Sequence, residues 1–158
     1  MSSNLTSMEL ATSLARRLRD QAMQDFNVSQ QQLQFEQNQL QQLQSYSDET
    51  QARWVTQSKG HATPELMRHY YQFMDKLQQA VDMQTQIVRD AAHRVDMRQA
   101  ALMQSEATLS GRETLCDQIR AGQRRLANQR EQKLLDEMAA QQHRRQHRHN
   151  DHGGEHGL

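Results

Sequence analysis

The chain has 158 residues, of which 35% are hydrophobic and 4% aromatic, and its formal net charge is zero. That apolar fraction lies below the roughly 45–50% usual for globular domains, so it excludes a compact core of ordinary size. The zero net charge argues against a dedicated nucleic-acid-binding protein, because such proteins carry a basic surplus that displaces counterions.

The remaining composition favours long helices over sheets. Gln is frequent, whereas there are only one Pro and six Gly. Gln, Glu, Arg, Met, Leu and Ala lose little rotamer freedom in a helix. Low hydrophobicity is also typical of disorder, so the periodicity of the apolar residues has to decide between the two.

A first helix is predicted over residues 5–57. A heptad spacing is shared by Phe26, Leu33, Leu40, Ser47 and Trp54, with Leu43 and Thr50 between them. Upstream, Leu10, Leu14 and Leu18 recur at fours, and this drift against the heptad indicates local unwinding or a hendecad stretch. The Gln-rich run 30–44 has a prion-like tract as its alternative interpretation, but its leucines keep a helical spacing.

A turn is predicted over residues 58–63. Gly60 can take the left-handed conformation that ends a helix. Thr63 suits the N-cap, Pro64 the first helical position and Glu65 the positive start of a helix. Because the connection is short, the two helices should pack antiparallel as a hairpin.

A second helix is predicted over residues 64–142. Its stripe has the a and d spacing of a coiled coil along Tyr70, Phe73, Leu77, Ala80, Gln84, Ile87 and Ala91. The stripe continues at sevens through Val95, Leu102, Leu109 and Cys116, and it is interrupted at Arg98, Ser105 and Gly122. From about residue 120 onward the second helix would extend past the first, and such an unpaired helix would fray or dock on a partner.

The tail 143–158 has no apolar stripe and carries five histidines beside Arg, Gly and Asn, so it is predicted to be disordered. His143, His147 and His149 could bind Ni²⁺ or Zn²⁺ opportunistically. A flexible tail offers these ligands no supporting hydrogen bonds, so neither a physiological metal site nor a cofactor is predicted. The predicted fold is thus all-α, a long antiparallel two-helix coiled-coil hairpin over residues 1–142 followed by this tail.

Catalysis and membrane insertion find no support in the sequence. There is no Gly-rich phosphate loop, and two helices form no concave pocket, so we expect the chain not to be an enzyme. The single cysteine, Cys116, excludes an intramolecular disulfide and should act as a small hydrophobic residue. Because there is no signal peptide and no run of about 18 apolar residues, we expect a soluble, cytoplasmic protein.

Three stretches of the chain resemble the FliJ family of the bacterial flagellar export apparatus. They are residues 40–46 (LQQLQSY) before the turn, 70–81 (YYQFMDKLQQAV) after it and 129–139 (QREQKLLDEMA) near the end of the second helix. The similarity runs from about residue 5 to residue 142 and needs no large insertion. On these motifs the chain is identified as a member of the family.

The resemblance implies both a fold and a role. FliJ-like proteins are antiparallel coiled coils similar to the central stalk of rotary ATPases. Such a stalk is expected to sit in the pore of the export ATPase hexamer, to reach the cytoplasmic domain of the export gate protein and to escort export chaperones. The implied location is the cytoplasm, peripheral at the inner face of the cell membrane at the flagellar basal body.

The family's gate-contacting surface carries over to positions on both helices near the turn: Gln39, Leu43, Tyr46, Phe73, Leu77 and Ala80. Two further positions, Thr50 and Gln84, differ from the residues usual in the family, so contact there would be weaker or shifted. The periodicity places Phe73 and Leu77 at seam positions, where filling the seam is an equal alternative, whereas Tyr46 falls one position off the seam and should face outward. Apolar anchors at such spacing suit helix-in-groove binding.

Arginines cluster toward the open end of the predicted hairpin: Arg16, Arg17, Arg19, Arg120, Arg124 and Arg125. They form either a solvated charged face or an electrostatic sleeve that docks against acidic loops of the export ATPase and speeds association. The leading interpretation of the chain is therefore an export stalk. Its alternatives are a general coiled-coil scaffold and a stalk of a related type III secretion system.

Overall fold

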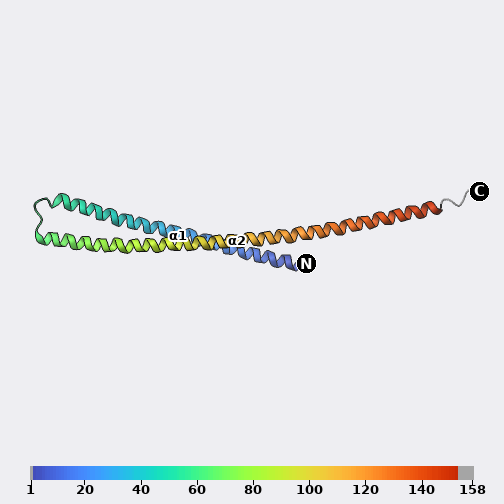
Figure 1. Cartoon of the computed structure of the whole chain (residues 1–158), viewed down its shortest axis with the longest axis horizontal. Coiled ribbons are helices and arrows are strands. Elements are labelled where there is room, and N and C mark those ends of the chain that lie inside the picture. The colour runs from blue at the N-terminus through green and yellow to red at the C-terminus, as the bar shows by residue number, and fades with distance from the viewer. Residues whose placement is uncertain (1, 153–158) are drawn as a thin grey trace, which may run out of the picture. The chain divides into compact units, whose positions relative to one another are not determined.

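The structure is a computed structural model that describes residues 2–152. Two α-helices make up this part of the chain, which contains no strand: α1 spans Ser2–Gln57 and α2 spans Pro64–His152. The two helices pack against each other as a helical hairpin (Figure 1), so the predicted all-α fold is confirmed.

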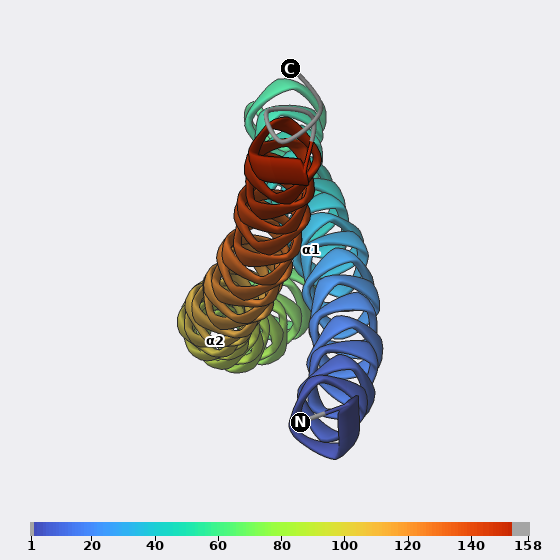
Figure 2. The same ribbon diagram turned by 90° about the vertical axis from the view of Figure 1, so that its right-hand side faces the viewer.

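Two compact units divide the chain, and each is described by itself. The turn unit comprises Leu14–Leu109, and the terminal unit combines Met1–Ser13 with Ser110–Leu158. Each unit therefore holds one segment of α1 and one segment of α2, whose ribbons run in opposite directions (Figures 1 and 2).

The helix bounds differ from the expected ones at both ends of the chain. α1 begins at Ser2 instead of residue 5, and α2 continues to His152 instead of ending at 142. Residues 143–152, expected to be disordered, are thus helical. Their Gln, Arg and His side chains tolerate a helix, and the basic ones favour its C-terminal end. The rest of the expected tail, 153–158, lies outside the described residues.

Local hydrogen bonds fix the turn where the helices were expected to break. The backbone N–H and the hydroxyl of Ser58 both donate to the Trp54 carbonyl, over 3.0 and 2.5 Å. Gly60 has φ 88°, the left-handed conformation that Gly takes without steric cost. The Leu66 N–H donates to Thr63 Oγ1 over 3.2 Å, so Thr63 caps the start of α2.

A heptad seam runs through the turn unit without drift. Its side chains are withdrawn from solvent at alternating steps of three and four, apart from the exposed Arg98. On α1 the seam comprises Ala15, Arg19, Ala22, Phe26, Ser29, Leu33, Glu36, Leu40, Leu43, Ser47, Thr50 and Trp54. On α2 it comprises Tyr70, Met74, Leu77, Val81, Gln84, Val88, Ala91, Val95, Leu102, Ser105 and Leu109.

On α2 the seam runs one residue away from part of the expected stripe. Phe73 and Ile87, which were expected on it, are 42% and 39% exposed. Met74 and Val88 take the seam positions instead. Because apolar residues occupy both neighbouring columns of the helix, the spacing alone does not distinguish them, and the packing of α1 decides.

On α1 the expected drift is wrong. Leu10, Leu14 and Leu18 are all exposed. The seam instead passes through Ala15, which is buried, and Arg19, whose Nε donates to the neighbouring Asp20 at 2.7 Å. From Ala15 onward the side chains withdrawn from solvent recur at alternating steps of three and four, so the heptad continues without local unwinding.

Few apolar side chains of the turn unit are buried, and half of those are alanines. The buried apolar residues are Ala15, Leu77, Ala91 and Leu109. Because burial stabilises by about 25 cal/mol per Å² of apolar surface, an alanine contributes little. Of these four residues, Leu77 and Leu109 therefore contribute more apolar stabilisation than Ala15 and Ala91 do.

A polar layer crosses the seam of the turn unit. The Gln84 amide donates to Oε2 of Glu36 over 2.6 Å and to its backbone carbonyl over 3.0 Å. Both side chains are part-buried. A slip of either helix would leave them without partners at the cost of burying unpaired polar groups, so this layer specifies the register.

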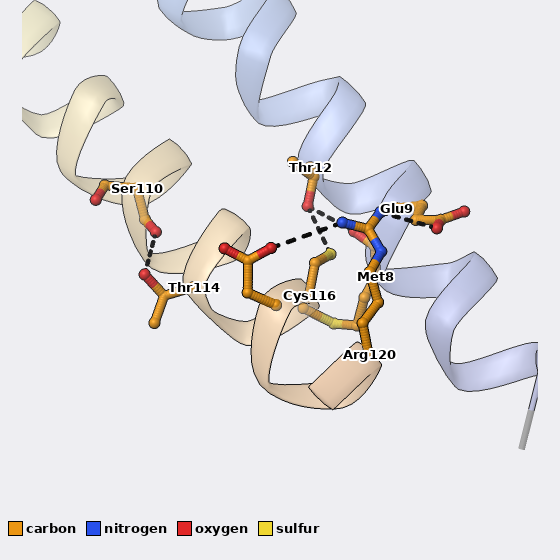
Figure 3. A network of polar contacts seen from close by, with 8 residues as sticks. Met8, Glu9, Thr12, Ser110, Thr114, Cys116 and Arg120 are labelled. Atoms are coloured by element: carbon orange, nitrogen blue, oxygen red, sulfur yellow. Dashed lines mark hydrogen bonds and ion pairs between the residues drawn. The ribbon is translucent and has the colours of Figure 1, made fainter. Parts of the chain in front are cut away.

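The terminal unit packs around another polar contact (Figure 3). Thr12 and Cys116 are both buried, and Thr12 Oγ1 lies 3.3 Å from Cys116 Sγ. The Thr12 hydroxyl donates to the Met8 carbonyl over 2.7 Å, which leaves the thiol to donate to Thr12 Oγ1. Beyond this contact, residues 124–151 of α2 are all exposed, so they have no packed face.

Candidate protein-binding surfaces

Aromatic side chains gather near the turn. The rings of Trp54 and Tyr70 stack with centroids 4.2 Å apart and an angle of 5°, and Tyr70 meets Tyr71 at 5.5 Å. Tyr46 and Phe73 form a T-shaped pair at 6.1 Å and 85°. Since the chain has only seven aromatic residues, five of them here mark this region as chemically distinct.

The two aromatic groups differ in what they offer a partner. Trp54 and Tyr70 lie on the seam and are partly withdrawn from solvent. Tyr46 and Phe73 lie beside the seam and are 49% and 42% exposed. An edge-to-face aromatic pair gains about 0.5–1.5 kcal/mol beyond its burial, so Tyr46 and Phe73 are held in place while much of both rings still faces solvent.

One side of the turn unit, which we term the g flank, contains this pair. It consists of the heptad positions g, directly beside the seam, and the adjoining positions c on both helices. The side chains at g near the turn are Gln39, Tyr46 and Arg53 on α1 and Leu66, Phe73 and Ala80 on α2. The opposite side, with the positions e and b, is the e flank.

The structure separates the expected gate-binding residues into two groups. Gln39, Tyr46, Phe73 and Ala80 belong to the g flank, with the first and last part-buried. Leu43 and Leu77 lie on the seam beneath them, and Leu77 is only 8% exposed. All these residues share one side of the turn unit, but Leu77 can act on a partner only by supporting the side chains above it.

The two positions that differ from the family pattern are both on the seam. Thr50 is part-buried. Gln84 directs its amide to Glu36 and so is engaged within the hairpin.

The g flank also holds apolar residues that the sequence did not assign to it. Ile87 is 39% and Met83 68% exposed, and both continue the flank away from the turn. The signal available in the sequence was the seven-residue step from Phe73 to Ala80 and Ile87, which was interpreted as part of the seam. Because Met74 and Val88 occupy the seam, Phe73 and Ile87 lie beside it and are exposed.

The expected ATPase-binding arginines fall into the two units. Arg16, Arg17 and Arg19 lie on α1 in the turn unit, and Arg120, Arg124 and Arg125 lie on α2 in the terminal unit. Arg17, Arg124 and Arg125 are exposed. Exposed guanidinium groups are suited to meeting carboxylates of a partner bidentately.

Arg120 is already paired within the chain. Its guanidinium lies 3.1 Å from Glu9 and 3.7 Å from Asp117 (Figure 3). The hydrogen bond to Glu9 raises the pKa of Arg120 above its usual value. A partner carboxylate at Arg120 would therefore have to displace Glu9.

Neither metal binding nor a membrane span is supported by residues 2–152. No group of three or more potential metal ligands comes together there. The rings of His143 and His147 meet at 4.8 Å and 86°, a pair and not a cluster. Neither α1 nor α2 has a stretch both long and apolar enough to cross a membrane.

The chain matches a protein-family model over most of its length. The family described as "Flagellar FliJ protein" matches residues 7–148. The matched range includes the turn, the g flank and all six arginines. No curated protein and no solved structure shows a significant match to the chain.

Proposed function

Because the chain belongs to the FliJ family and is therefore a component of the flagellar export apparatus, we propose that it serves there as a stalk linking the export ATPase hexamer to the export gate. In this role it provides helical surfaces for partners and carries out no reaction itself. The turn unit contacts the cytoplasmic domain of the gate protein, and the arginines contact the ATPase. Export chaperones are escorted by the same chain, a role supported by family membership alone.

The Tyr46–Phe73 pair carries the proposal for the gate. It combines two exposed rings, one from each helix, in a chain with 4% aromatic residues. Aromatic residues commonly contribute most of the binding energy of an interface, because they bury a large rigid surface at little entropic cost. Gln39 and Ala80 border the pair with uncharged side chains, whereas the exposed Glu49 and Lys76 beside it are charged, so a partner would meet the rings together with two charges.

The ATPase contact rests on charge. Arg17, Arg124 and Arg125 are exposed, and steering by such groups raises association rates more than it deepens affinity. Arg19 and Arg120 are engaged with Asp20 and Glu9 and so contribute less. This predicts that association with the ATPase slows as salt concentration rises.

The decisive experiment measures binding of the purified cytoplasmic domain of the gate protein to the full chain. Phe73→Ala should weaken that binding about tenfold, the effect of losing an anchor worth over 1 kcal/mol, with helicity by circular dichroism retained. Met103→Ala is the matched control, because Met103 is exposed but lies off the g flank. If the wild-type chain binds neither the gate domain nor the ATPase hexamer, the proposal is refuted and a general scaffold is favoured.

A further inference from the structure

Exposed large apolar side chains of the turn unit gather on the g flank. On α2 they are Leu66, Phe73, Met83, Ile87 and Met97. On α1 they are Leu14, Leu18, Val28, Phe35 and Tyr46. The e flank of the described turn unit has Met23 and Tyr71 at its e positions, with Val55 and Met103 further out. The two sides of one coiled coil therefore differ strongly in apolar exposure.

The middle of the g flank is also nearly free of charge. Between residues 28 and 46 of α1 its side chains are Val, Gln, Phe and Tyr, and between 73 and 87 of α2 the one charged residue is Lys76. Lys76 forms no ion pair with any described residue. Protein surfaces that face water normally intersperse charges of both signs, so this stretch is suited to being covered.

The spacing of the apolar residues indicates what would cover it. Phe73, Ala80 and Ile87 follow one another at sevens, and Phe73 to Ile87 spans about 21 Å at about 1.5 Å per residue. A heptad column beside an existing seam is the surface against which a third helix packs in a bundle. Helix-in-groove recognition uses apolar anchors at this spacing.

We propose that the g flank binds one amphipathic α-helix of a partner protein and forms a three-helix bundle with it. The contacting face of that helix is apolar and uncharged except for one carboxylate that pairs with Lys76, since a buried charge without a partner is costly. The inference rests on the proposed function, in which the export gate supplies the partner surface. It extends the binding site from Tyr46 and Phe73 to Met83 and Ile87.

A second copy of this chain fits the flank less well. Its unpaired segment, residues 124–151, has exposed large apolar residues at Leu126, Leu134, Leu135 and Met138, and Leu126 stands eight residues before the next of them. These side chains do not repeat at sevens as Phe73, Ala80 and Ile87 do. Charged residues also lie at the seam positions of the segment, so it does not present the uncharged face that the flank requires.

Calorimetric titration of the gate's cytoplasmic domain into the full chain tests the extended site. Ile87→Gln and Met83→Gln should each weaken binding about tenfold, while Met103→Gln, an exposed methionine off the flank, should leave it unchanged. All three positions are exposed enough for the hairpin to fold, which circular dichroism verifies. Overlapping peptides of the gate domain, about 20 residues long so that a helix of about 30 Å covers the distance of about 21 Å from Phe73 to Ile87, should include one that gains helicity on binding.

The outcomes separate this inference from the proposed function. Weakening by Phe73→Ala but not by Ile87→Gln or Met83→Gln would overturn the extended site and leave gate binding intact. A bound peptide that gains no helicity would overturn the helical occupant. A dimer of the chain alone that Ile87→Gln dissociates, measured by light scattering, would assign the flank to a second copy and likewise overturn the proposal. No binding of the wild-type chain to the gate domain would overturn the extended site together with the gate contact of the proposed function, whereas the ATPase contact would be tested separately.

Discussion

Replacing Leu77 with alanine tests the seam at its most informative position. The side chain is 8% exposed, so nearly all of it leaves water on folding, and full burial of a leucine is worth about 1.5–3 kcal/mol. The vacated volume adds a cavity cost, which brings typical Leu→Ala losses to about 2–5 kcal/mol. Two helices enclose a cavity less completely than a globular core, so the neighbours can close in. We therefore expect a loss of about 2–3 kcal/mol, the lower part of that range.

Urea unfolding followed by circular dichroism measures this loss. The midpoint should fall while the slope stays constant, because the surface exposed on unfolding hardly changes. Met83→Ala serves as the control, since Met83 is 68% exposed, and it should cost less than about 0.5 kcal/mol. A loss of stability below about 1 kcal/mol for Leu77→Ala would contradict the assignment of Leu77 to the seam. Leu77 would then be a surface residue that contacts a partner directly.

Three other substitutions test the turn and the polar layer. Gly60→Ala should cost about 1 kcal/mol, purely from strain at φ 88°, because an added Cβ meets no atom within 4 Å; unchanged stability would contradict this. Thr63→Ala should cost about 1 kcal/mol through loss of the cap, as measured by thermal unfolding, while Thr63→Ser should retain most of it. Gln84→Ala should cost about 1–2 kcal/mol because Glu36 loses both hydrogen bonds, and a double-mutant cycle with Glu36→Ala should show coupling between the two.

The turn could be predicted from the sequence because its chemistry is local. Gly60, Thr63 and Pro64 each determine the backbone around themselves, through a left-handed φ, a cap and a fixed φ, whatever the rest of the chain does. The structure accordingly ends α1 at Gln57 and starts α2 at Pro64. The all-α hairpin then follows from helical spacing on both sides of one short connection.

The phase of the seam could not be predicted in the same way. Phe73 and Met74 are both apolar, and so are Ile87 and Val88, so single-helix periodicity permits either column. Which column faces inward depends on the opposing helix, a non-local contact that spacing does not encode. This dependence on the opposing helix also explains why the predicted drift at Leu14 was wrong. It explains too why the g flank was not predicted, because Phe73 and Ile87 were assigned to the seam.

The gate-binding residues were predicted from the resemblance to the family, and their exposure in the structure shows which of them a partner could contact directly. Tyr46 faces outward as its off-seam position indicated. Leu77 proved to be interior, a distinction that family motifs cannot make, since residues on and beside a seam occur together in the same stretch of sequence. Binding by either residue stays a prediction.

The buried Cys116 thiol beside Thr12 can report how often the two helices of the terminal unit separate. Cys116 is the sole thiol of the chain and is 3% exposed, so a soluble alkylating reagent reaches it only when the two helices around it part. The rate of Cys116 modification therefore measures how often the two helices separate in the wild-type protein. Slower labelling in the presence of the ATPase hexamer would reveal, without any introduced probe, that the hexamer clamps these helices together.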